Sequence, residues 1–450
     1  MKILLWHGYL LSGSGSNVYT SNVAAAWRRQ GHHVLLMCQQ GRVDGFGAID
    51  AAGDFSGDNG SYDVVPTGAA PARGTCDLVR PDIAGLLPVY VYDDYEGFLV
   101  KLFTDLSDEE LRLYVEANVD AMATALRRFQ PEAVITGHEV MGPYIALLAC
   151  ERTGHRYAAK LHGSALEYAV KLQARYLKYA TEGLGGALRV AGGNRYMVEE
   201  AASVVPGWRD KAVVINPGVD VELFKPLVDK LPGSTVAYVG KLIAEKGVHN
   251  FIAVLGATTQ PLDEVVVVGY GGDERAIKDL VSALAAGDRN GALAVSARLR
   301  WSDELAAWLE DADETLIDRF ATIPIRFTGR LEHGPLSKIL PAFDVLVVPS
   351  IVHEAFGMVA AEAAACGVLP IVPNHSGIAE AGLAIEERLD SPGLLTFDRS
   401  RPIEGIAAGI DRILALDRSD RIRMGAAAST LATERWSWTE VAQRLLEAAV

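Results

Sequence analysis

Short runs of β-branched and other apolar residues alternate with longer stretches of helical spacing along the chain. Residues 3–6 read as a buried strand, residues 18–30 carry helical spacing, and residues 34–38 form a second apolar run. Gly31 follows the helical stretch, as is typical of a helix end. This order predicts a βαβ unit with a parallel sheet and a right-handed crossover.

The rest of the first half is less regular. Residues 41–74 are rich in Gly, Asp, Ala and Pro, which predicts a long surface loop. Helical spacing returns over residues 108–129. Further strands are predicted at residues 133–136, 157–161, 188–191 and 213–215.

A second alternating run begins after residues 218–234, which contain two prolines and no clear period. Its strands are predicted at residues 235–239, 264–268, 325–328, 345–348 and 369–372. The stretch 276–323 is longer than one crossover needs, so we expect extra helices there, one of them over residues 303–309. Residues 436–450 read as an amphipathic helix.

Two successive α/β halves predict two Rossmann-like domains that face a central cleft. We place the first domain at residues 1–217, a linker at 218–233 and the second domain at 234–435. Ligands in such open sheets bind beyond the carboxyl ends of the strands.

Composition narrows the class of protein. The 450 residues are half hydrophobic and 22% charged, as in folded globular chains, and the formal net charge is −15. This charge disfavours nucleic acid and anionic membranes as partners. The first residues read as a buried strand rather than a signal peptide, and no run reaches about 18 apolar residues, so we expect no membrane span. The four cysteines form no CxxC pair, which disfavours disulfides and structural zinc and favours a cytoplasmic location.

The strongest local signal is HEAFGMVAAEAAACG at residues 353–367, which follows an apolar strand and opens a helix. Glu354 lies in the turn, and Glu362 lies eight residues further on the helix. Free N–H groups in residues 355–358 would form a phosphate site at the helix N-terminus. Taken alone, the same spacing fits two surface glutamates on an alanine-rich helix.

Two lysines follow the first strand of the second domain. Lys241 and Lys246 lie five residues apart, beside Gly240 and Gly247, which would let a ligand approach the backbone closely. Two cations at a strand end suit a diphosphate, although isolated lysines in such positions are often solvated surface groups.

Together with VINPGVDVELFKP (214–226), VVVVGYGGDE (265–274) and IRFTGRL (325–331), these segments resemble glycosyltransferase family 4, a group of retaining enzymes with the GT-B fold. The matching segments occur in order along most of both halves. The resemblance implies that the final helix crosses back to the first domain; the alternative is an ordinary helix of the second domain.

The resemblance implies a role for each matching residue in the second domain. Glu354 would hold donor-sugar hydroxyls, Glu362 the ribose hydroxyls, and Lys241 and Lys246 the leaving diphosphate. Lys241 occupies a position where most relatives have Arg, so it offers a single ammonium charge rather than a bidentate guanidinium group. The remaining donor-binding residues implied in this domain are Ala355, Phe356, Gly357, Met358, Val359, Arg330 and Leu331.

In the first domain, Gly13, Ser14, Gly15 and Ser16 match a glycine loop under the diphosphate, although a plain β–α turn fits equally well. His162 in KLHGS matches a histidine near the reacting sugar, with a core histidine as the alternative. Asn194 and Tyr95 are acceptor candidates, and residues 86–98 are expected to shape the acceptor pocket.

No metal or cofactor is expected. The best metal-binding pair, Asp311 and Asp313, lies in a polar helical stretch, so lysines and helix N–H groups would replace the metal. The resemblance to retaining family members implies front-face transfer of a hexose from UDP- or GDP-sugar, with ADP-sugar as a further option. The leaving phosphate would take the acceptor proton.

The acceptor is expected to be a small soluble molecule, as in natural product biosynthesis, rather than a lipid at the membrane; a homodimer is compatible with the sequence. An NAD-dependent oxidoreductase is one alternative, but Gly13-x-Gly15 lacks the third glycine of the dinucleotide fingerprint. A non-catalytic nucleotide-sugar binder and a pyridoxal-phosphate phosphorylase are the others, and no segment matches the lysine of the latter.

Overall fold

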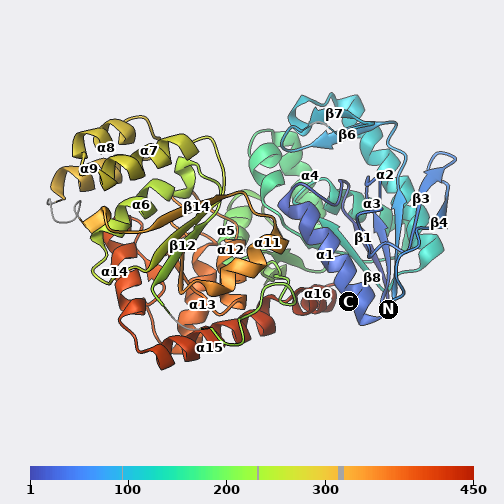
Figure 1. The fold of residues 1–450 in the computed structure, drawn as a ribbon. Helices are drawn as coiled ribbons and strands as arrows, with labels where there is room; N and C mark the ends of the chain where they lie inside the picture. The colour runs from blue at the N-terminus through green and yellow to red at the C-terminus, as the bar shows by residue number, and fades with distance from the viewer. Residues whose placement is uncertain (94, 231–232, 313–318) are drawn as a thin grey trace. The chain divides into compact units, whose positions relative to one another are not determined.

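The computed structural model describes residues 1–93, 95–230, 233–312 and 319–450. These residues form two compact units. The first consists of Met1–Gly218 and Trp438–Val450, and the second of Val219–Ser437. Each unit has a parallel sheet with helices on both faces (Figure 1).

The first unit contains a nine-stranded sheet of order β11-β10-β9-β8-β1-β2-β5-β3-β4. Neighbouring strands are parallel except β3 and β4. The strands are β1 (Lys2–Trp6), β2 (His33–Met37), β3 (Ala51–Ser56), β4 (Ser61–Pro66), β5 (Thr75–Arg80), β8 (Ala133–Gly137), β9 (Ala158–Lys160), β10 (Val190–Gly192) and β11 (Ala212–Val214). β6 (Leu86–Val89) and β7 (Leu99–Leu102) form a separate parallel pair.

The predicted loop over residues 41–74 is wrong in its central part. β3 and β4 lie there as an antiparallel hairpin, and β3 pairs with β5 at the sheet edge. Asp50 fixes the entry to this hairpin, because its carboxylate accepts hydrogen bonds from the Arg28 guanidinium at 2.7 Å and from the Cys76 N–H at 2.7 Å. These contacts join residues far apart in the sequence, so local periodicity could not reveal them.

Alternation along β1 explains why helices cover both faces of this sheet. Leu4 and Trp6 belong to one buried cluster, whereas Ile3 and Leu5 belong to another on the opposite face. Helices α1 and α16 pack against each other, and α3 packs against α2 and α4. The helices of the unit are α1 (Gly15–Gln30), α2 (Asp108–Phe129), α3 (Gly142–Thr153), α4 (Ala174–Gly186), α5 (Arg195–Val204) and α16 (Trp438–Glu447).

The second unit contains a fully parallel six-stranded sheet of order β14-β13-β12-β15-β16-β17. The order reverses between β12 and β15, so the carboxyl ends of these two strands form the expected ligand position. The strands are β12 (Thr235–Val239), β13 (Glu264–Val268), β14 (Ile325–Gly329), β15 (Val345–Val347), β16 (Leu369–Pro373) and β17 (Thr396–Phe397).

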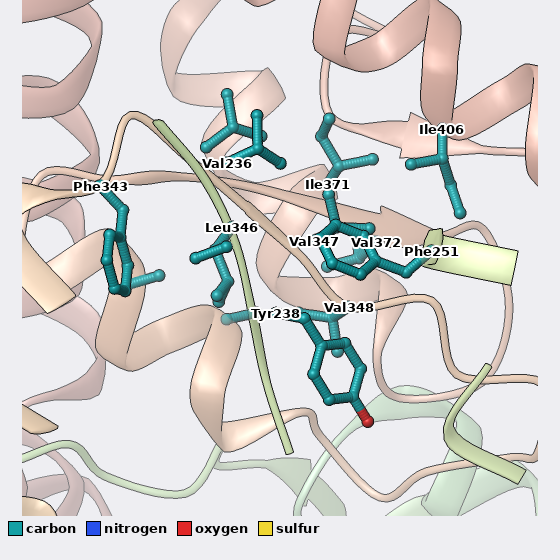
Figure 2. Packing of buried hydrophobic residues seen from close by; sticks show 14 of the residues in the cluster. Val236, Tyr238, Phe251, Phe343, Leu346, Val347, Val348, Ile371, Val372 and Ile406 are labelled. Carbon is teal, nitrogen blue, oxygen red and sulfur yellow. The ribbon is translucent and has the colours of Figure 1, made fainter. Parts of the chain in front are cut away.

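Apolar side chains from both faces of this sheet pack against the surrounding helices. Figure 2 shows Tyr238 of β12, Leu346 of β15 and Ile371 of β16 in this core. Helices α6 and α14 pack together, as do α12, α13 and α15. The helices are α6 (Val248–Ala257), α7 (Glu274–Ala285), α8 (Arg289–Ser296), α9 (Asp303–Asp311), α11 (His333–Ile339), α12 (Met358–Ala365), α13 (Ala379–Leu389), α14 (Pro402–Leu414) and α15 (Arg418–Trp436). The extra helices expected between residues 276 and 323 are therefore confirmed.

Two crossings of the chain connect the units. Val219 and Phe224 are buried in the core of the second unit, so the residues that follow Gly218 pack there rather than forming a free linker. The chain returns between Ser437 and Trp438, and α16 then packs on α1. Trp27 of α1 donates a hydrogen bond to the Ala442 carbonyl at 2.9 Å, which fixes the returning helix to the first unit.

Candidate functional site

The loop between β15 and α12 presents the amino end of a helix at the carboxyl edge of the second sheet. Gly357 precedes α12 with a left-handed backbone (φ 69°), and no side chain caps the helix. Within the described part of the chain, the N–H groups of Gly357, Met358 and Val359 have no hydrogen-bond partner. Such groups, with the positive end of the helix dipole, form an anion site.

Lys246 and Glu354 meet beside this helix end. The Lys246 Nζ lies 2.9 Å from the Glu354 Oε1 as an ion pair, although the orientation makes no hydrogen bond. Both side chains are mostly buried, with 31% and 18% of their surfaces exposed. Each charge therefore compensates the other in a partly desolvated position.

Backbone contacts hold the two segments of this pair together. Gly247 has a left-handed backbone (φ 68°), and a Cβ there would lie 2.0 Å from the Pro349 carbonyl oxygen. The Glu245 carbonyl accepts a hydrogen bond from the Ile351 N–H at 3.0 Å. The glycine predicted to admit a ligand thus serves a close approach between two protein segments.

Glu354 is also held from its other side. Its N–H donates to the Ser376 Oγ at 3.2 Å, and its carbonyl accepts from the Gly377 N–H at 3.0 Å. The backbone at Glu354 is therefore fixed independently of its carboxylate.

Glu362 lies on α12, and its side chain is turned away from solvent. Its side chain is 8% exposed, and its Oε1 lies 3.6 Å from the Nε2 of His333. Burial raises the pKa of Glu362, and the neighbouring His333 partly opposes this rise. A buried carboxylate in this position can accept hydrogen bonds from paired hydroxyl groups.

The carboxyl ends of β13 and β14 bring Tyr270 and Arg330 together. The Arg330 guanidinium lies 5.1 Å from the centre of the Tyr270 ring, and its Nη2 lies 2.7 Å from the Glu332 carboxylate. Tyr270 is 45% exposed. Leu331 is half-buried beside this pair, so the segment offers an aromatic ring, a cation and an apolar contact.

Lys241 lies on the same edge but away from the ion pair. Its side chain is exposed, and within the described residues its ammonium group has no partner. Ala355 and Met358 are also exposed, whereas Phe356 is buried and packs 5.9 Å from Trp436. Phe356 can therefore offer only its backbone to a ligand.

In the first unit, the glycine loop follows β1 and starts α1. Gly13 has a left-handed backbone (φ 94°), Gly15 begins α1, and both glycines are exposed. Ser14 caps α1, because its Oγ accepts a hydrogen bond from the Asn17 N–H at 3.3 Å. The Ser16 Oγ lies 3.1 Å from the Ser14 Oγ.

His162 belongs to a group of imidazoles at the ends of β1, β8 and β9. Its ring lies 4.8 Å from His138 and 6.4 Å from His7. Burial lowers the pKa of His162, with further lowering by His138 and Lys160. The rings of His7 and His138 are buried and their pKa values are also lowered, so all three imidazoles are neutral near pH 7.

Lys160 and Glu139 lie in the same buried region. Burial lowers the pKa of Lys160 to about 7, and its Nζ donates to the Ile215 carbonyl at 3.2 Å. Burial raises the pKa of Glu139, whose Oε1 accepts from the Gly163 N–H at 2.8 Å. In this region of the first unit, burial therefore disfavours the charged form of each of these groups.

The two acceptor candidates have different environments. Asn194 is fully buried and caps α5, with its Oδ1 accepting from the Met197 N–H at 2.6 Å. It presents no surface to an acceptor in this structure. Tyr95 is half-buried and packs against the core of the first unit.

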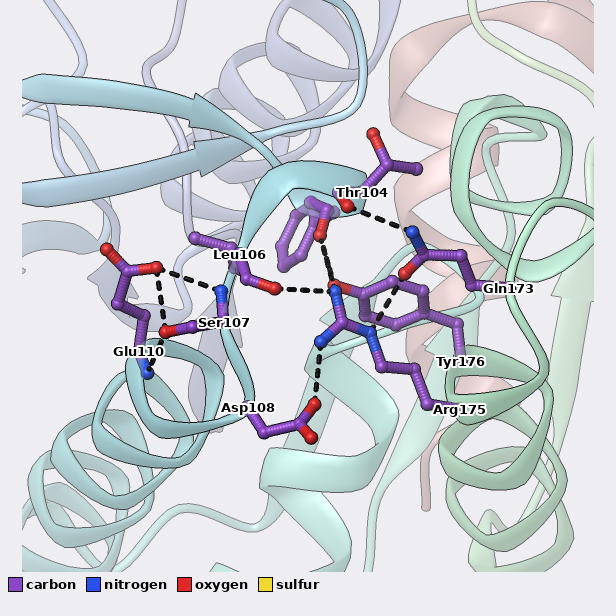
Figure 3. A network of polar contacts seen from close by, with 9 residues as sticks. Thr104, Leu106, Ser107, Asp108, Glu110, Gln173, Arg175 and Tyr176 are labelled. Atoms are coloured by element: carbon purple, nitrogen blue, oxygen red, sulfur yellow. Dashed lines mark hydrogen bonds and ion pairs between the residues drawn. The ribbon is translucent and has the colours of Figure 1, made fainter.

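A polar network holds the segment that follows β7, close in sequence to Tyr95 (Figure 3). The Arg175 guanidinium donates to the Leu106 carbonyl at 2.8 Å and pairs with the Asp108 carboxylate at 2.8 Å. Ser107 and Glu110 form a reciprocal capping box at the start of α2. This segment is therefore anchored to α4 rather than free.

Metal ligands do not gather anywhere in the described residues. No group of three or more His, Cys, Asp or Glu side chains there could hold a metal ion. Of the weak aspartate pair, Asp311 ends α9, and Asp313 lies outside the described residues. No described helix is long and apolar enough to cross a bilayer.

Six polar residues of these sites were not predicted from the sequence: His7, His138, Glu139, Lys160, Tyr270 and His333. Tyr270 and His333 follow strands β13 and β14, so their position at a strand end was a usable signal. His138 and Lys160 also lie at strand ends, but their burial and mutual contact depend on the tertiary structure.

The fold recurs in solved glycosyltransferase structures. Sucrose-phosphate synthase from Thermosynechococcus elongatus matches with a TM-score of 0.57 at 18% identity, covering 99% of this chain and 97% of that one. The Anabaena protein Alr3699/HepE in complex with UDP matches with a TM-score of 0.60 at 14% identity, covering 99% of both chains. The fold is therefore that of the GT-B glycosyltransferases, and the prediction of two Rossmann-like domains is confirmed.

Sequence comparison defines the family more closely. Residues 14–218 match the glycosyl transferase 4-like domain, and residues 318–430 match the glycosyl transferases group 1 family. D-inositol 3-phosphate glycosyltransferase from Mycobacterium leprae is 27% identical over 52% of this chain and 48% of its own length. Glycogen synthase from Mycobacterium tuberculosis is 28% identical over 53% of this chain and 47% of its own.

The chain belongs to glycosyltransferase family 4. It spans about half the length of the curated relatives that it matches.

Proposed function

We propose that this protein transfers a hexose from a nucleotide-diphosphate sugar to a small hydroxyl-bearing acceptor and retains the anomeric configuration. The observation that carries the proposal is the Lys246–Glu354 ion pair beside the uncapped amino end of α12. A diphosphate would replace Glu354 as the partner of Lys246, and the freed carboxylate would then accept hydrogen bonds from the donor sugar.

The other donor contacts follow from the same edge of the second unit. The distal phosphate would accept from the N–H groups of Gly357, Met358 and Val359. Glu362 would hold the ribose hydroxyls, and Arg330 with Tyr270 would flank the base. Lys241 would add a second positive charge to the diphosphate site.

UDP is our first choice of nucleotide and GDP the second. Structural neighbours were solved with UDP and with UDP-2-fluoro glucose, which supports this order. Lysines and helix N–H groups would stabilise the leaving diphosphate without a metal ion. We propose front-face attack, in which the acceptor hydroxyl adds to the anomeric carbon as its bond to the phosphate oxygen breaks, and that phosphate takes the acceptor proton.

The first unit would supply the acceptor side. Its buried histidines are neutral, which favours a polar, uncharged acceptor group over a phosphate at that position. Soluble acceptors are our proposal; a lipid acceptor is the alternative, to be separated by offering both classes to the protein.

Thermal unfolding with UDP, GDP and ADP tests the donor site. A nucleotide at 100 times its dissociation constant should stabilise the second unit by about 2.7 kcal/mol. Lys246→Ala should abolish the shift, whereas Lys278→Ala, which removes an exposed lysine of α7, should keep it. A full shift in Lys246→Ala would refute the diphosphate assignment.

Turnover separates catalysis from binding alone. Glu354→Gln should keep the nucleotide shift but reduce transfer about 100-fold, because the sugar would lose its orientation. A chelator should leave turnover unchanged, and the product should keep the donor's anomeric configuration by nuclear magnetic resonance. An inverted product, or undiminished transfer by Glu354→Gln, would contradict the mechanism.

A further inference from the structure

The second unit has a cavity of about 500 Å³ that includes none of the proposed donor residues. Its walls come from residues 349–353 after β15, from the ends of α6, α9 and α14, and from the segment after β17. Helices α6, α9 and α14 pack against one another beside it (Figure 1). Its volume lies within the range of about 300–1,000 Å³ that small-molecule sites occupy.

Trp301 is the most unusual residue of this cavity. It is 52% exposed, whereas the six other tryptophans of the chain are buried or half-buried. Its backbone is left-handed (φ 56°), a strained conformation for a bulky residue. The His249 Nε2–H donates to the Trp301 carbonyl at 2.9 Å, which holds the backbone in place. The fold thus fixes a large aromatic ring at the edge of an open cavity.

Polar groups without partners line the same cavity. Asn250 is 1% exposed, yet its Oδ1 has no hydrogen-bond partner among the described residues. Asp303 and Glu304, in the first turn of α9, also have no ion-pair or hydrogen-bond partner there. Acidic residues favour a helix start in any case. That preference does not explain the buried amide oxygen or the exposed indole ring.

The charges exclude one class of ligand. Asp303 and Glu304 outnumber Arg399, whose Nη1 already donates to the His353 Nε2 at 3.4 Å. An anion such as a phosphate would meet a net negative lining. A neutral molecule with several hydroxyl groups would instead donate to the two carboxylates and to the Asn250 amide oxygen.

We propose that this cavity is a second carbohydrate-binding site, which takes a neutral hexose or short neutral oligosaccharide against the indole ring of Trp301. A sugar ring has an apolar face of C–H groups and an edge of hydroxyl groups. The indole ring suits the first, and the carboxylates and amide suit the second. This inference goes beyond the proposed donor site and uses none of its residues.

Glu245 connects the cavity to the turn that contains Lys246. The Arg300 guanidinium, next to Trp301, pairs with the Glu245 carboxylate at 3.2 Å. The Glu245 carbonyl in turn accepts from Ile351, which lines the cavity. The proposed sugar site and the Lys246 turn are therefore neighbours that share a support, and each needs its own test.

Tryptophan fluorescence and calorimetry of the full chain with maltose, cellobiose and maltotriose test the site. Binding should be saturable and should shift the emission, because Trp301 is the tryptophan most exposed to solvent. Trp301→Ala should weaken binding about 3- to 10-fold, and Trp301→Phe should weaken it less. Leu383→Ala, at a 44% exposed residue of α13, should leave the affinity unchanged.

Three results would overturn the inference: no saturable binding of any of the three sugars, equal affinity in Trp301→Ala, or competition by inorganic phosphate that Arg399→Ala removes. Thermal unfolding of the variant without ligand reports whether Trp301→Ala is folded. If that variant is unfolded, the double change Asp303→Asn, Glu304→Gln must weaken sugar binding instead. If the unaltered protein bound the sugars but showed no UDP shift, the proposed donor site would be refuted and the inference of a sugar site would stand.

Discussion

The helices α1 and α12 both start near the point where the strand order of their sheet reverses, but their amino ends differ. Each helix follows the carboxyl end of a parallel strand near the point where the strand order reverses. In α1 the Ser14 hydroxyl caps the helix, whereas α12 begins after Gly357 without a side-chain cap. Only the second helix leaves its amino end fully available to an anion.

The two units also differ in the charge of their ionisable groups near these helices. Lys246 and Glu354 form an ion pair in a partly solvated position. His138 and Lys160 are buried and His162 is half-buried, and desolvation lowers the pKa values of all three. Two units of similar topology thus provide a charged site and a largely neutral one, which supports our assignment of the donor to the second unit.

The largest expected effect comes from breaking the charged site at its support. Gly247→Val would place a Cβ 2.0 Å from the Pro349 carbonyl oxygen and force a branched residue into a left-handed backbone. We expect a loss of roughly 2–5 kcal/mol in the free energy of unfolding of the second unit. Thermal and denaturant unfolding of the purified variant measure this loss, and the UDP shift should disappear with it.

Gly272→Ala is the matched control for this change. A Cβ at Gly272 meets no atom within 4 Å, so the stability should stay within about 0.5 kcal/mol of the unaltered protein. If Gly247→Val were as stable as this control, the close contact between the two segments would not exist in solution.

The neutral site can be tested through the pH dependence of stability. Burial lowers the pKa of Lys160 to about 7, whereas an unfolded chain keeps the lysine proton up to about pH 10.4. Between these values the unfolded state binds more protons, so the Lys160 contribution raises the free energy of unfolding by about 1.4 kcal/mol per pH unit. Lys160→Met should remove this rise between about pH 7 and 9.

Comparing how the free energy of unfolding changes with pH, rather than its absolute value, separates the Lys160 titration from other effects of the substitution on stability. Lys178→Met changes an exposed lysine of α4 and should keep the slope of the unaltered protein. Glu139 and His162 face Lys160 in the same region and remain in every variant. Identical slopes for all three proteins would mean that Lys160 stays charged in the folded state.

The sequence predicted elements well wherever a strand or helix has its own hydrophobic period. Helix α2 was predicted with its observed bounds, as were strands β12 and β13. The β3–β4 hairpin was missed, because its strands mix glycine with exposed polar residues and depend on pairing with β5. A sheet edge of this kind has little local signal.

In the candidate site, too, the residues of one segment could be predicted from the sequence, whereas their partners from other segments could not. Glu354, Gly357 and Glu362 lie in one strand–loop–helix segment, so their arrangement could be inferred from spacing alone. The partners that set their electrostatics come from elsewhere: Lys246 from the turn after β12, and His333 from the start of α11. Such pairs depend on strand order and register, which no single segment specifies.

The smallest expected effect tests the difference between the amino ends of α1 and α12. Ser14→Ala removes the hydroxyl that accepts the Asn17 N–H at 3.3 Å, so the first unit should lose about 1 kcal/mol of stability. Ser14→Gly should cost only a few tenths of a kcal/mol, because glycine is tolerated at this position, and Ser12→Ala should cost less still. Thermal unfolding without nucleotide measures all three. If Ser14→Ala and Ser12→Ala were equally stable, Ser14 would not cap α1 in solution, and the amino end of α1 would be as open to an anion as that of α12.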